Sequence, residues 1–269
     1  MINILFRPDS RNFPKLYMRD IPPRIARIPP MPKHTGPGGR LLPGCLALIH
    51  EDRDIIVVDK PAGLLTISTD REKSRTAYFI LTDYVRKGVT KSRNRIFVVH
   101  RLDRETSGIL IFAKNEEAKF RLQDQWSDTR KIYFAVVHGR CEKRQETITT
   151  YLAENQAHGV YTTNDARIGK LAHTAYKVLK HTKDFSLLEV NLLTGRKHQI
   201  RVHLADIGHP VVGDERYGKE HKRHQRLALH AKSISFAHPI TGEPLSFDTK
   251  VPAYFTALVG HWEQCISGG

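Results

Sequence analysis

The chain has 269 residues, and 40% of them are hydrophobic, which is enough to bury the core of one large domain. Its 43 lysines and arginines outnumber its 28 aspartates and glutamates. The formal charge of +15 favours a polyanionic partner, above all nucleic acid, over a solvated basic surface without a ligand. No apolar run of about 18 residues and no apolar signal core occurs, so we expect no membrane segment and a cytoplasmic protein. Three cysteines without CxxC spacing argue against a disulfide framework and a zinc cluster.

Residues 1–45 are rich in proline, glycine and arginine and show little periodicity. We expect an extension there, which contact with the main domain or with nucleic acid could order. Regular patterning begins at Leu46 and ends near Val259, without an internal repeat or a second linker. The sequence therefore predicts one main domain over residues 46–259, followed by a tail over residues 260–269.

In chain order, the first predicted strand is the β-branched run 55–58. Helical spacing predicts a helix over 76–86, Asn115 can cap a second helix, and 197–207 forms a third that Gly208 ends. Further strands are expected at 97–99, 109–113, 132–137, 172–179, 185–192, 227–236 and 245–247. Strands outnumber helices and do not alternate with them regularly. This pattern predicts an α+β domain with a mixed, mainly antiparallel central sheet rather than a doubly wound parallel sheet.

The densest polar segment between two predicted strands runs from His100 to Gly108. A loop between buried strands holds its side chains at a sheet edge, which suits a reacting carboxylate flanked by cations. Arg101 and Arg104 are positioned in sequence to keep Asp103 ionised and to contact phosphates. On composition alone, a surface ion-pair loop is an equally good interpretation.

This loop resembles the HRLDxxTSG signature of the pseudouridine synthases related to the large-subunit ribosomal RNA enzyme A. The matching residues are His100, Arg101, Leu102, Asp103, Thr106, Ser107 and Gly108. Segments that resemble the same family follow in the same order at 58–64, 131–133, 194–203, 208–210 and 213–214. The resemblance covers residues 46–251 and implies a single pseudouridine synthase catalytic domain, with no recognisable S4 RNA-binding domain in the first 45 residues.

The resemblance also implies roles for individual residues. Asp103 becomes the catalytic aspartate, Tyr133 the aromatic residue against the target base, and Arg201 the partner of the aspartate. Arg101 corresponds to the side chain that enters the RNA stack where the uridine leaves, and Arg104 is a further RNA-binding candidate. We expect the guanidinium of Arg201 to hold the carboxylate bidentately.

Physical chemistry is compatible with these roles without requiring them. Tyr133 alternates with apolar neighbours on its strand, so we expect it on the opposite face, where a base could stack; a half-buried strand tyrosine is the alternative. Arg201 and His198 lie off the apolar stripe of their predicted helix and could face a cleft, whereas a solvated arginine is the alternative.

Isomerisation of uridine in folded RNA requires the nucleotide to be flipped out and its glycosidic bond to break. Asp103 could attack C1′, stabilise a cationic sugar, or help remove the C2′ proton to give a glycal, and the sequence does not choose among these routes. No metal and no cofactor is expected, because the histidine pairs 198/203 and 221/224 lack the HExxH pattern. The basic segment 219–226 could grip RNA.

The partner predicted from these observations is ribosomal or transfer RNA, and a monomer is favoured. Two other functions remain open at this stage. A uridine glycosylase also uses a carboxylate beside a flipped base, and a non-catalytic RNA-binding or ribosome-assembly factor makes equal use of the positive charge.

Overall fold

The computed structural model describes residues 40–68, 72, 74–89, 91–218 and 226–262, all of which belong to one unit, Pro32–Gly269. Most of the predicted extension, most of the predicted tail, and the basic segment 219–226 except Arg226 lie outside the described residues. Within the described part, Leu41 and Leu42 pair with the next strand although the prediction assigned them to the extension. No helix in the described part of the chain is long and apolar enough to span a membrane.

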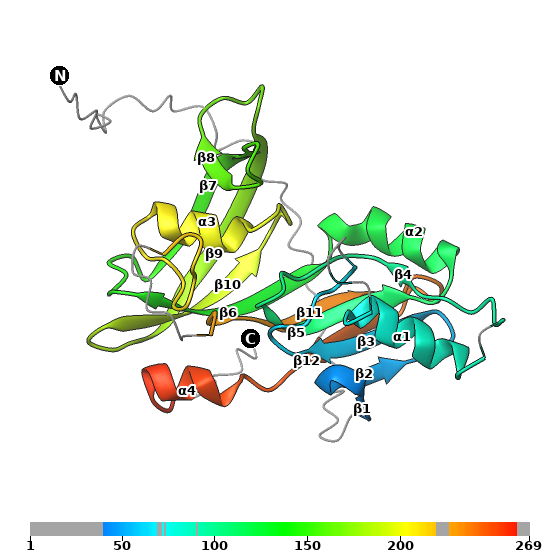
Figure 1. Cartoon of the computed structure of the whole chain (residues 1–269). Coiled ribbons are helices and arrows are strands. Elements are labelled where there is room, and N and C mark those ends of the chain that lie inside the picture. Colours follow the sequence, from blue (N-terminus) through cyan, green and yellow to red (C-terminus); the bar gives the residue numbers. More distant parts are fainter. Residues whose placement is uncertain (1–39, 69–71, 73, 90, 219–225, 263–269) are drawn as a thin grey trace. The chain divides into compact units, whose positions relative to one another are not determined.

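A single sheet of twelve strands organises this unit (Figure 1). Its strands are β1 (Leu41–Leu42), β2 (Leu46–Glu51), β3 (Ile55–Lys60), β4 (Phe97–Val98), β5 (Ser107–Ala113), β6 (Arg130–His138), β7 (Gln145–Glu154), β8 (Val160–Thr163), β9 (Lys170–His181), β10 (Phe185–Leu192), β11 (Leu229–Ala237) and β12 (Pro244–Asp248). They follow the order β1-β2-β3-β5-β11-β6-β10-β9-β7-β8, with β4 paired to β5 and β12 to β11. Among the named strands, only β5 and β11 pair in parallel. The predicted α+β class with a mainly antiparallel sheet is therefore confirmed.

Four α-helices cover parts of the sheet: α1 (Ala77–Arg86), α2 (Glu116–Asp124), α3 (Gln199–Asp206) and α4 (Ala253–Val259). The first two begin at capping residues, where Thr76 accepts a hydrogen bond from Phe79 N and Asn115 accepts one from Ala118 N. Short 3-10 helices lie at Pro43–Cys45 and Gln125–Ser127. The predicted ranges of the first and third helices match α1 and α3 within about two residues, and α2 begins directly after the predicted cap Asn115.

The central strands are buried on both faces, and residue parity assigns each face to a helix. On β3, Ile56 and Val58 join the apolar cluster that contains Leu81 of α1, whereas Val57 joins the cluster that contains Leu122 of α2. Successive side chains of a strand point to opposite faces, so α1 and α2 cover opposite sides of the sheet. In the other part of the sheet, α3 packs against β8 and β9 (Figure 1).

One glycine makes the parallel pairing of β5 with β11 possible. Gly108 has a φ of +110°, and a Cβ atom built on it would lie 2.3 Å from the carbonyl oxygen of Ala231. Any other residue would therefore clash with the β11 backbone. Gly108 thus fixes the end of the predicted polar loop against β11.

Sequence patterning did not predict β2, β7, β8 or α4. The long strand β7 has threonines and charged residues along much of its length and is only partly buried, so it lacks a continuous apolar signal. The short helix α4 follows Pro252 and buries Phe255 and Val259. Both elements owe their place to partners that are distant in sequence.

Candidate active site

The loop between β4 and β5 carries Asp103, and the buried amine of Lys60 anchors it. Lys60 Nζ donates to the carbonyl oxygens of Pro61 (2.9 Å), Leu64 (2.8 Å) and Arg104 (3.0 Å). Its side chain is fully buried, and this burial lowers the pKa of Lys60 to about 7, although the charges of Glu105 and Asp103 act to raise it. The amine therefore ties the β3 turn to the loop next to Asp103.

A second tie joins the loop to the chain that leads into α1. The hydroxyl of Thr66 donates to the carbonyl of Leu102 (2.8 Å) and accepts from the amide of Leu102 (3.2 Å). On the other side of the loop, His100 Nε2 accepts a hydrogen bond from Ile111 N at 3.1 Å. These contacts hold the backbone on both sides of Asp103, so its carboxylate has a defined position.

Asp103 lies beside Arg201 of α3, although 98 residues separate them in the chain. Arg201 Nη1 donates to Asp103 Oδ2 at 2.9 Å, and 24% of the Asp103 side chain stays accessible. The expected bidentate contact between these two residues is wrong, since only one nitrogen of Arg201 bonds to Asp103. The other donors of the guanidinium have a different partner.

That partner is Asp214, which holds Arg201 in a two-point ion pair. Arg201 Nε and Nη2 donate to the two oxygens of Asp214 at 2.7 and 2.8 Å. Asp214 Oδ1 also accepts the backbone amides of Arg216 and Tyr217. Burial acts to raise the pKa of Asp214, but the hydrogen bonds and charge of Arg201 outweigh it and leave the pKa below its ordinary value. The guanidinium thus makes its two-point contact with Asp214, and its third nitrogen, Nη1, donates to Asp103.

The pKa of Arg201 reflects both carboxylates. Burial acts to lower it, but the hydrogen bonds and charges of Asp214 and Asp103 raise the pKa of Arg201 above its ordinary range. Its guanidinium carbon also lies 5.2 Å from the ring centroid of Tyr217. Arg201 is therefore a permanent, oriented cation next to Asp103.

His198 approaches the other oxygen of Asp103. Its Nε2 lies 3.7 Å from Asp103 Oδ1, and its Nδ1 lies 2.8 Å from the hydroxyl of Tyr217. Because the Tyr217 oxygen already accepts the amide of Val160 (3.2 Å), its own proton is free to go to His198 Nδ1. This arrangement puts the ring proton of neutral His198 on Nε2, facing Asp103. Burial is the main cause that lowers the pKa of His198, which favours the neutral ring.

Tyr133 lies on β6 and is 8% exposed. Ile132 and Phe134 are buried as well, so both faces of β6 are covered at this point. Burial therefore does not distinguish the face of Tyr133 from that of its apolar neighbours. Burial, followed by the negative charge of Asp103, raises the pKa of Tyr133, so its ring stays neutral.

The two loop arginines do not pair with Asp103. Arg104 is exposed, and its Nε donates to the carbonyl of Gly63 at 3.1 Å, while Glu105 lies 3.7 Å away. Arg101 is also exposed and makes no hydrogen bond or ion pair with another described residue. The cation that accompanies Asp103 is thus Arg201, not Arg101 or Arg104 as the loop sequence suggested. Both loop arginines therefore face solvent, and their guanidinium groups are accessible to the phosphates of an RNA.

Comparison with known proteins agrees with this geometry. A family model described as RNA pseudouridylate synthase matches residues 54–206. The ribosomal large subunit pseudouridine synthase D of Zymomonas mobilis is 34% identical over 238 residues, which cover 83% of this chain and 73% of that protein. This chain belongs to the RNA pseudouridylate synthase family. As an RNA pseudouridine synthase, it is an isomerase that acts on RNA.

Other relatives support the same assignment. The ribosomal large subunit pseudouridine synthase C of Rickettsia bellii is 34% identical over 218 residues, covering 78% of this chain and 70% of that protein. The solved structure of human RNA pseudouridylate synthase domain containing 1 matches with a TM-score of 0.62 and 27% identity, covering 81% of this chain and 88% of that one. Human RNA pseudouridylate synthase domain containing 4 has a TM-score of 0.66 at 22% identity, covering 78% and 90%, and its likeness concerns the fold alone.

The structure adds residues to the pseudouridine synthase site that sequence reasoning missed. Asp214 lies in a segment that resembles the family, yet nothing local in the sequence reveals that it orients Arg201. Lys60 lies in the segment 58–64 that resembles the family, yet the sequence does not reveal that its amine anchors the loop, and Tyr217 gave no signal beyond its residue type. His198 was noted for its helix face and as one of a histidine pair without the HExxH pattern, whereas it precedes α3 with a left-handed φ of 53°. Such a backbone is unfavourable for a residue with a Cβ, so the contacts of its ring hold it there.

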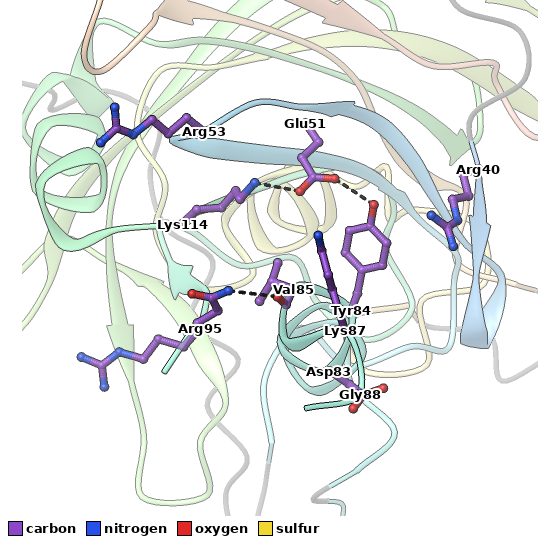
Figure 2. Close-up of a pocket in the computed structure, with 11 residues that line it drawn as sticks. Arg40, Glu51, Arg53, Asp83, Tyr84, Val85, Lys87, Gly88, Arg95 and Lys114 are labelled. Atoms are coloured by element: carbon purple, nitrogen blue, oxygen red, sulfur yellow. Dashed lines mark hydrogen bonds and ion pairs between the residues drawn. The ribbon is translucent and has the colours of Figure 1, made fainter. Parts of the chain in front are cut away.

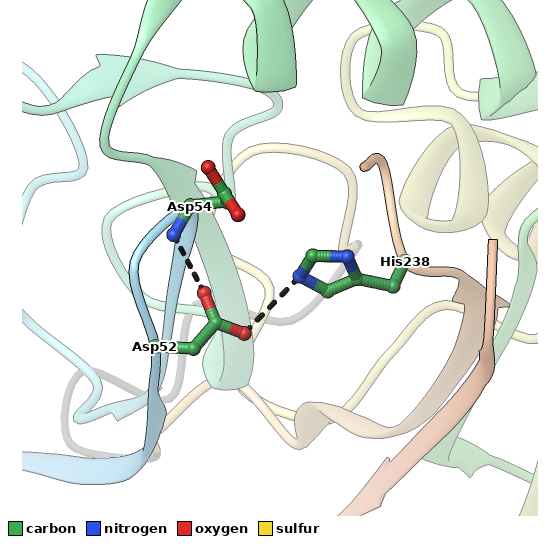
Figure 3. Close-up of side chains that lie close together, drawn as sticks. All are labelled: Asp52, Asp54 and His238. Carbon is green, nitrogen blue, oxygen red and sulfur yellow. Dashed lines mark hydrogen bonds and ion pairs between the residues drawn. The ribbon is translucent and has the colours of Figure 1, made fainter. Parts of the chain in front are cut away.

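A cluster outside the site resembles a metal centre only in its residue types. Asp52, Asp54 and His238 bring ligand-type atoms within 4.8 Å of one another (Figure 3). However, His238 Nδ1 accepts the amides of Ile240 (3.3 Å) and Thr241 (3.1 Å), so Nε2 carries the proton and donates to Asp52 Oδ2 at 3.2 Å. Neither nitrogen then offers a free lone pair. The cluster instead ties the β2–β3 turn to the β11–β12 turn.

Proposed function

We propose that this pseudouridine synthase isomerises specific uridines in ribosomal or transfer RNA by base flipping, with Asp103 as its catalytic carboxylate. The observation that carries the proposal is the 2.9 Å ion pair between Arg201 and Asp103, within the loop that matches the family signature. Asp103 keeps one accessible side, while Arg201 is fixed from behind by Asp214. A nucleophile or base needs this combination of access and orientation.

The reaction rearranges bonds within one nucleotide. The bond between N1 and C1′ breaks, the detached uracil rotates, and C5 bonds to C1′. C5 then loses its hydrogen as a proton and N1 gains one, so no electrons are exchanged with a carrier. Asp103 acts at the sugar by one of three routes: attack on C1′, stabilisation of a cationic C1′, or removal of the C2′ proton.

Arg201 keeps Asp103 reactive when the substrate covers it. A flipped base excludes water from the carboxylate, and desolvation by itself favours the neutral acid. The guanidinium at 2.9 Å opposes this by favouring the charged form. The N–H of His198 Nε2 faces the second oxygen of Asp103, Oδ1, and favours the same orientation of the carboxylate.

The remaining site residues act on the RNA. Tyr133 lies against the flipped base, Arg101 fills the space that the uridine leaves in the stack, and Arg104 contacts phosphate. Both arginines are exposed at the loop surface, which supports such contacts. In this proposal residues 46–259 form the catalytic domain, and the enzyme works as a monomer in the cytoplasm.

Ribosomal RNA is the preferred substrate class in this proposal. The relatives named above act, by their names, on the ribosomal large subunit. Transfer RNA is the second class to be tested, because the roles proposed for Asp103, Tyr133 and Arg201 concern the flipped uridine rather than features of one class of RNA.

The deciding experiment incubates the purified full chain, in the presence of chelator, with cellular RNA labelled with tritium at C5 of uridine. We expect tritium release and pseudouridine in the nucleoside digest, with activity lost in Asp103→Asn. Free uracil instead of pseudouridine would identify a glycosylase. Binding of RNA without any product would identify a non-catalytic binder.

A further inference from the structure

A recess of about 890 Å³ lies at the C-terminal end of α1, beside β2 (Figure 2). Five basic and two acidic side chains line it: Arg40, Arg53, Lys87, Arg95 and Lys114, with Glu51 and Asp83. Figure 2 shows the guanidinium groups of Arg53 and Arg95 on one side of the recess and that of Arg40 on the other. The excess of positive charge makes it a candidate for an anionic ligand.

The main acidic group in the recess is already neutralised. Glu51 accepts hydrogen bonds from Lys114 Nζ (2.7 Å) and from the hydroxyl of Tyr84 (2.8 Å). Burial acts to raise the pKa of Glu51, but these two hydrogen bonds lower it, so the group is an ionised carboxylate balanced by Lys114. The negative charge of Glu51 therefore offsets little of the positive charge that the three arginines and Lys87 contribute.

Two of these cations have no protein partner within the described part of the chain. The exposed side chains of Arg53 and Lys87 make no hydrogen bond, ion pair or ring contact with another described residue. In contrast, Arg95 is paired with Glu116 at 2.9 Å, and Arg40 lies over the ring of Tyr84 at 5.5 Å. Arg53 and Lys87 are thus the groups most available to an external anion.

The helix α1 links the recess rigidly to the Asp103 loop. At its start, Ala77 N donates to Leu65 O, and Tyr78 N donates to Thr66 O, while Thr66 is bonded to Leu102 next to Asp103. At its end lies Lys87, about 15 Å further along the helix axis for ten helical residues.

We propose that this recess binds the phosphodiester backbone of the substrate RNA in a segment that flanks the flipped uridine, with Arg53 and Lys87 as phosphate contacts. The proposal rests on the proposed function, since it takes the RNA at Asp103 as its reference point. It gives the enzyme a second anchor, which selects uridines whose flanking RNA runs along α1. Phosphate contacts of this kind set register and affinity rather than sequence preference.

The test compares two double variants that remove the same charges. In Arg53→Gln with Lys87→Asn, the asparagine suits the left-handed φ of 53° at position 87. The matched control is Arg140→Gln with Lys183→Asn, an exposed arginine and lysine near the β9–β10 turn. Affinity for a mixed-sequence hairpin RNA is measured by fluorescence anisotropy over a series of salt concentrations.

We expect the recess variant to lose affinity roughly 5-fold per lost contact near 0.15 M salt, and the slope of log K against log salt to shrink by about 0.9 per contact. The KM for tritium release should rise accordingly, with a much smaller change in kcat, whereas the control variant should change little. Equal losses in both variants would mean diffuse attraction and would overturn the proposal. So would displacement of the RNA by inorganic phosphate at constant ionic strength, which would indicate a site for small anions.

These outcomes separate the recess from the proposed function. If the wild-type chain binds RNA and loses affinity only in the recess variant, yet forms no pseudouridine, the proposed function fails and the recess stands. If the wild-type chain forms pseudouridine and the two variants behave alike, the recess fails and the proposed function stands.

Discussion

Two regions of the chain meet at the candidate active site, and they differ in what they contribute. The signature loop, His100 to Gly108, supplies Asp103, which is partly accessible and makes one short ion pair. The second region, which we call the clamp, runs from Thr194 to Tyr217 and supplies Arg201 together with the fully buried side chain of Asp214. The reactive carboxylate is therefore partly accessible and makes one short ion pair, whereas its counter-charge is buried and held at several points.

This difference separates chemistry from stability. A change in the loop carboxylate removes a group that the fold barely uses, so it should affect turnover and leave the fold intact. A change in the clamp breaks a buried ion pair, which costs stability as well as orientation. The experiments below test whether the two effects divide in this way.

The largest expected effect is that of Asp103→Asn on turnover. We expect tritium release to fall by roughly 10³-fold or more, because an amide can neither attack C1′ nor accept a proton. RNA affinity and the melting temperature should stay near those of the wild type. The control is Glu105→Gln, which neutralises an exposed carboxylate in the same loop. Normal turnover in Asp103→Asn would remove the aspartate from the chemistry.

The next largest effect is that of Arg201→Lys, which keeps the positive charge but removes the planar guanidinium and its several donors. A lysine ammonium cannot bond to both oxygens of Asp214 and to Asp103 in the observed geometry. We expect turnover to fall by roughly 10²-fold while RNA binding persists. Arg196→Lys, at an exposed arginine before α3, is the matched control. If Arg201→Lys turned over at the control rate, charge alone would suffice and the clamp geometry would be irrelevant.

For Asp214→Asn the expected effect lies mainly in stability. The change leaves the buried cation of Arg201 without its main partner, which costs about 3–5 kcal/mol. For a domain of this size the melting temperature should fall by roughly 10 °C, and turnover at permissive temperature by roughly tenfold. Asp165→Asn, at an acid paired on the surface with Arg167, is the control and should change the melting temperature little.

The pH dependence of this stability difference has a definite sign. The folded-state pKa of Asp214 lies below the ordinary value of 3.8, so its ion pair stabilises the fold fully above that value. The advantage of the wild type over Asp214→Asn should shrink as the pH falls below 3.8 through the folded-state pKa. Thermal melts of both proteins between neutral and acid pH would show this, and a pH-independent difference would contradict it.

The sequence reveals the loop and the clamp unequally, for a physical reason. Asp103 lies between two apolar runs within a short polar segment, so local pattern predicts both its strands and its exposure. Arg201 could be predicted to look away from the apolar stripe of its helix, but its double contact with Asp214 could not. Side-chain pairing between a helix and a loop depends on tertiary packing, which periodicity does not encode. The same limit explains why Arg101 and Arg104 seemed to be the neighbours of Asp103, and why β7 was missed.

The smallest expected effect is that of Tyr217→Phe, which removes one hydroxyl from the clamp. The change leaves the ring under Arg201 but takes away the acceptor for Val160 N, whose residue is 7% exposed, and the donor to His198 Nδ1. A buried amide without a partner costs about 1 kcal/mol or more. Without the donor, His198 can place its proton on either nitrogen, so Nε2 faces Asp103 as a donor only part of the time.

We therefore expect a loss of turnover of only about 2- to 5-fold in Tyr217→Phe, since Arg201 still orients Asp103. Tyr161→Phe, at an exposed tyrosine on β8, is the matched control and should behave as the wild type. The single-turnover rate at saturating enzyme separates this orientation effect from a binding effect, because weaker RNA binding alone would leave that rate unchanged. A loss as large as that of Arg201→Lys would instead mean that the His198 donor orients Asp103 as strongly as the guanidinium does. Tyr217, rather than Asp214, would then be the residue of the clamp on which turnover mainly depends.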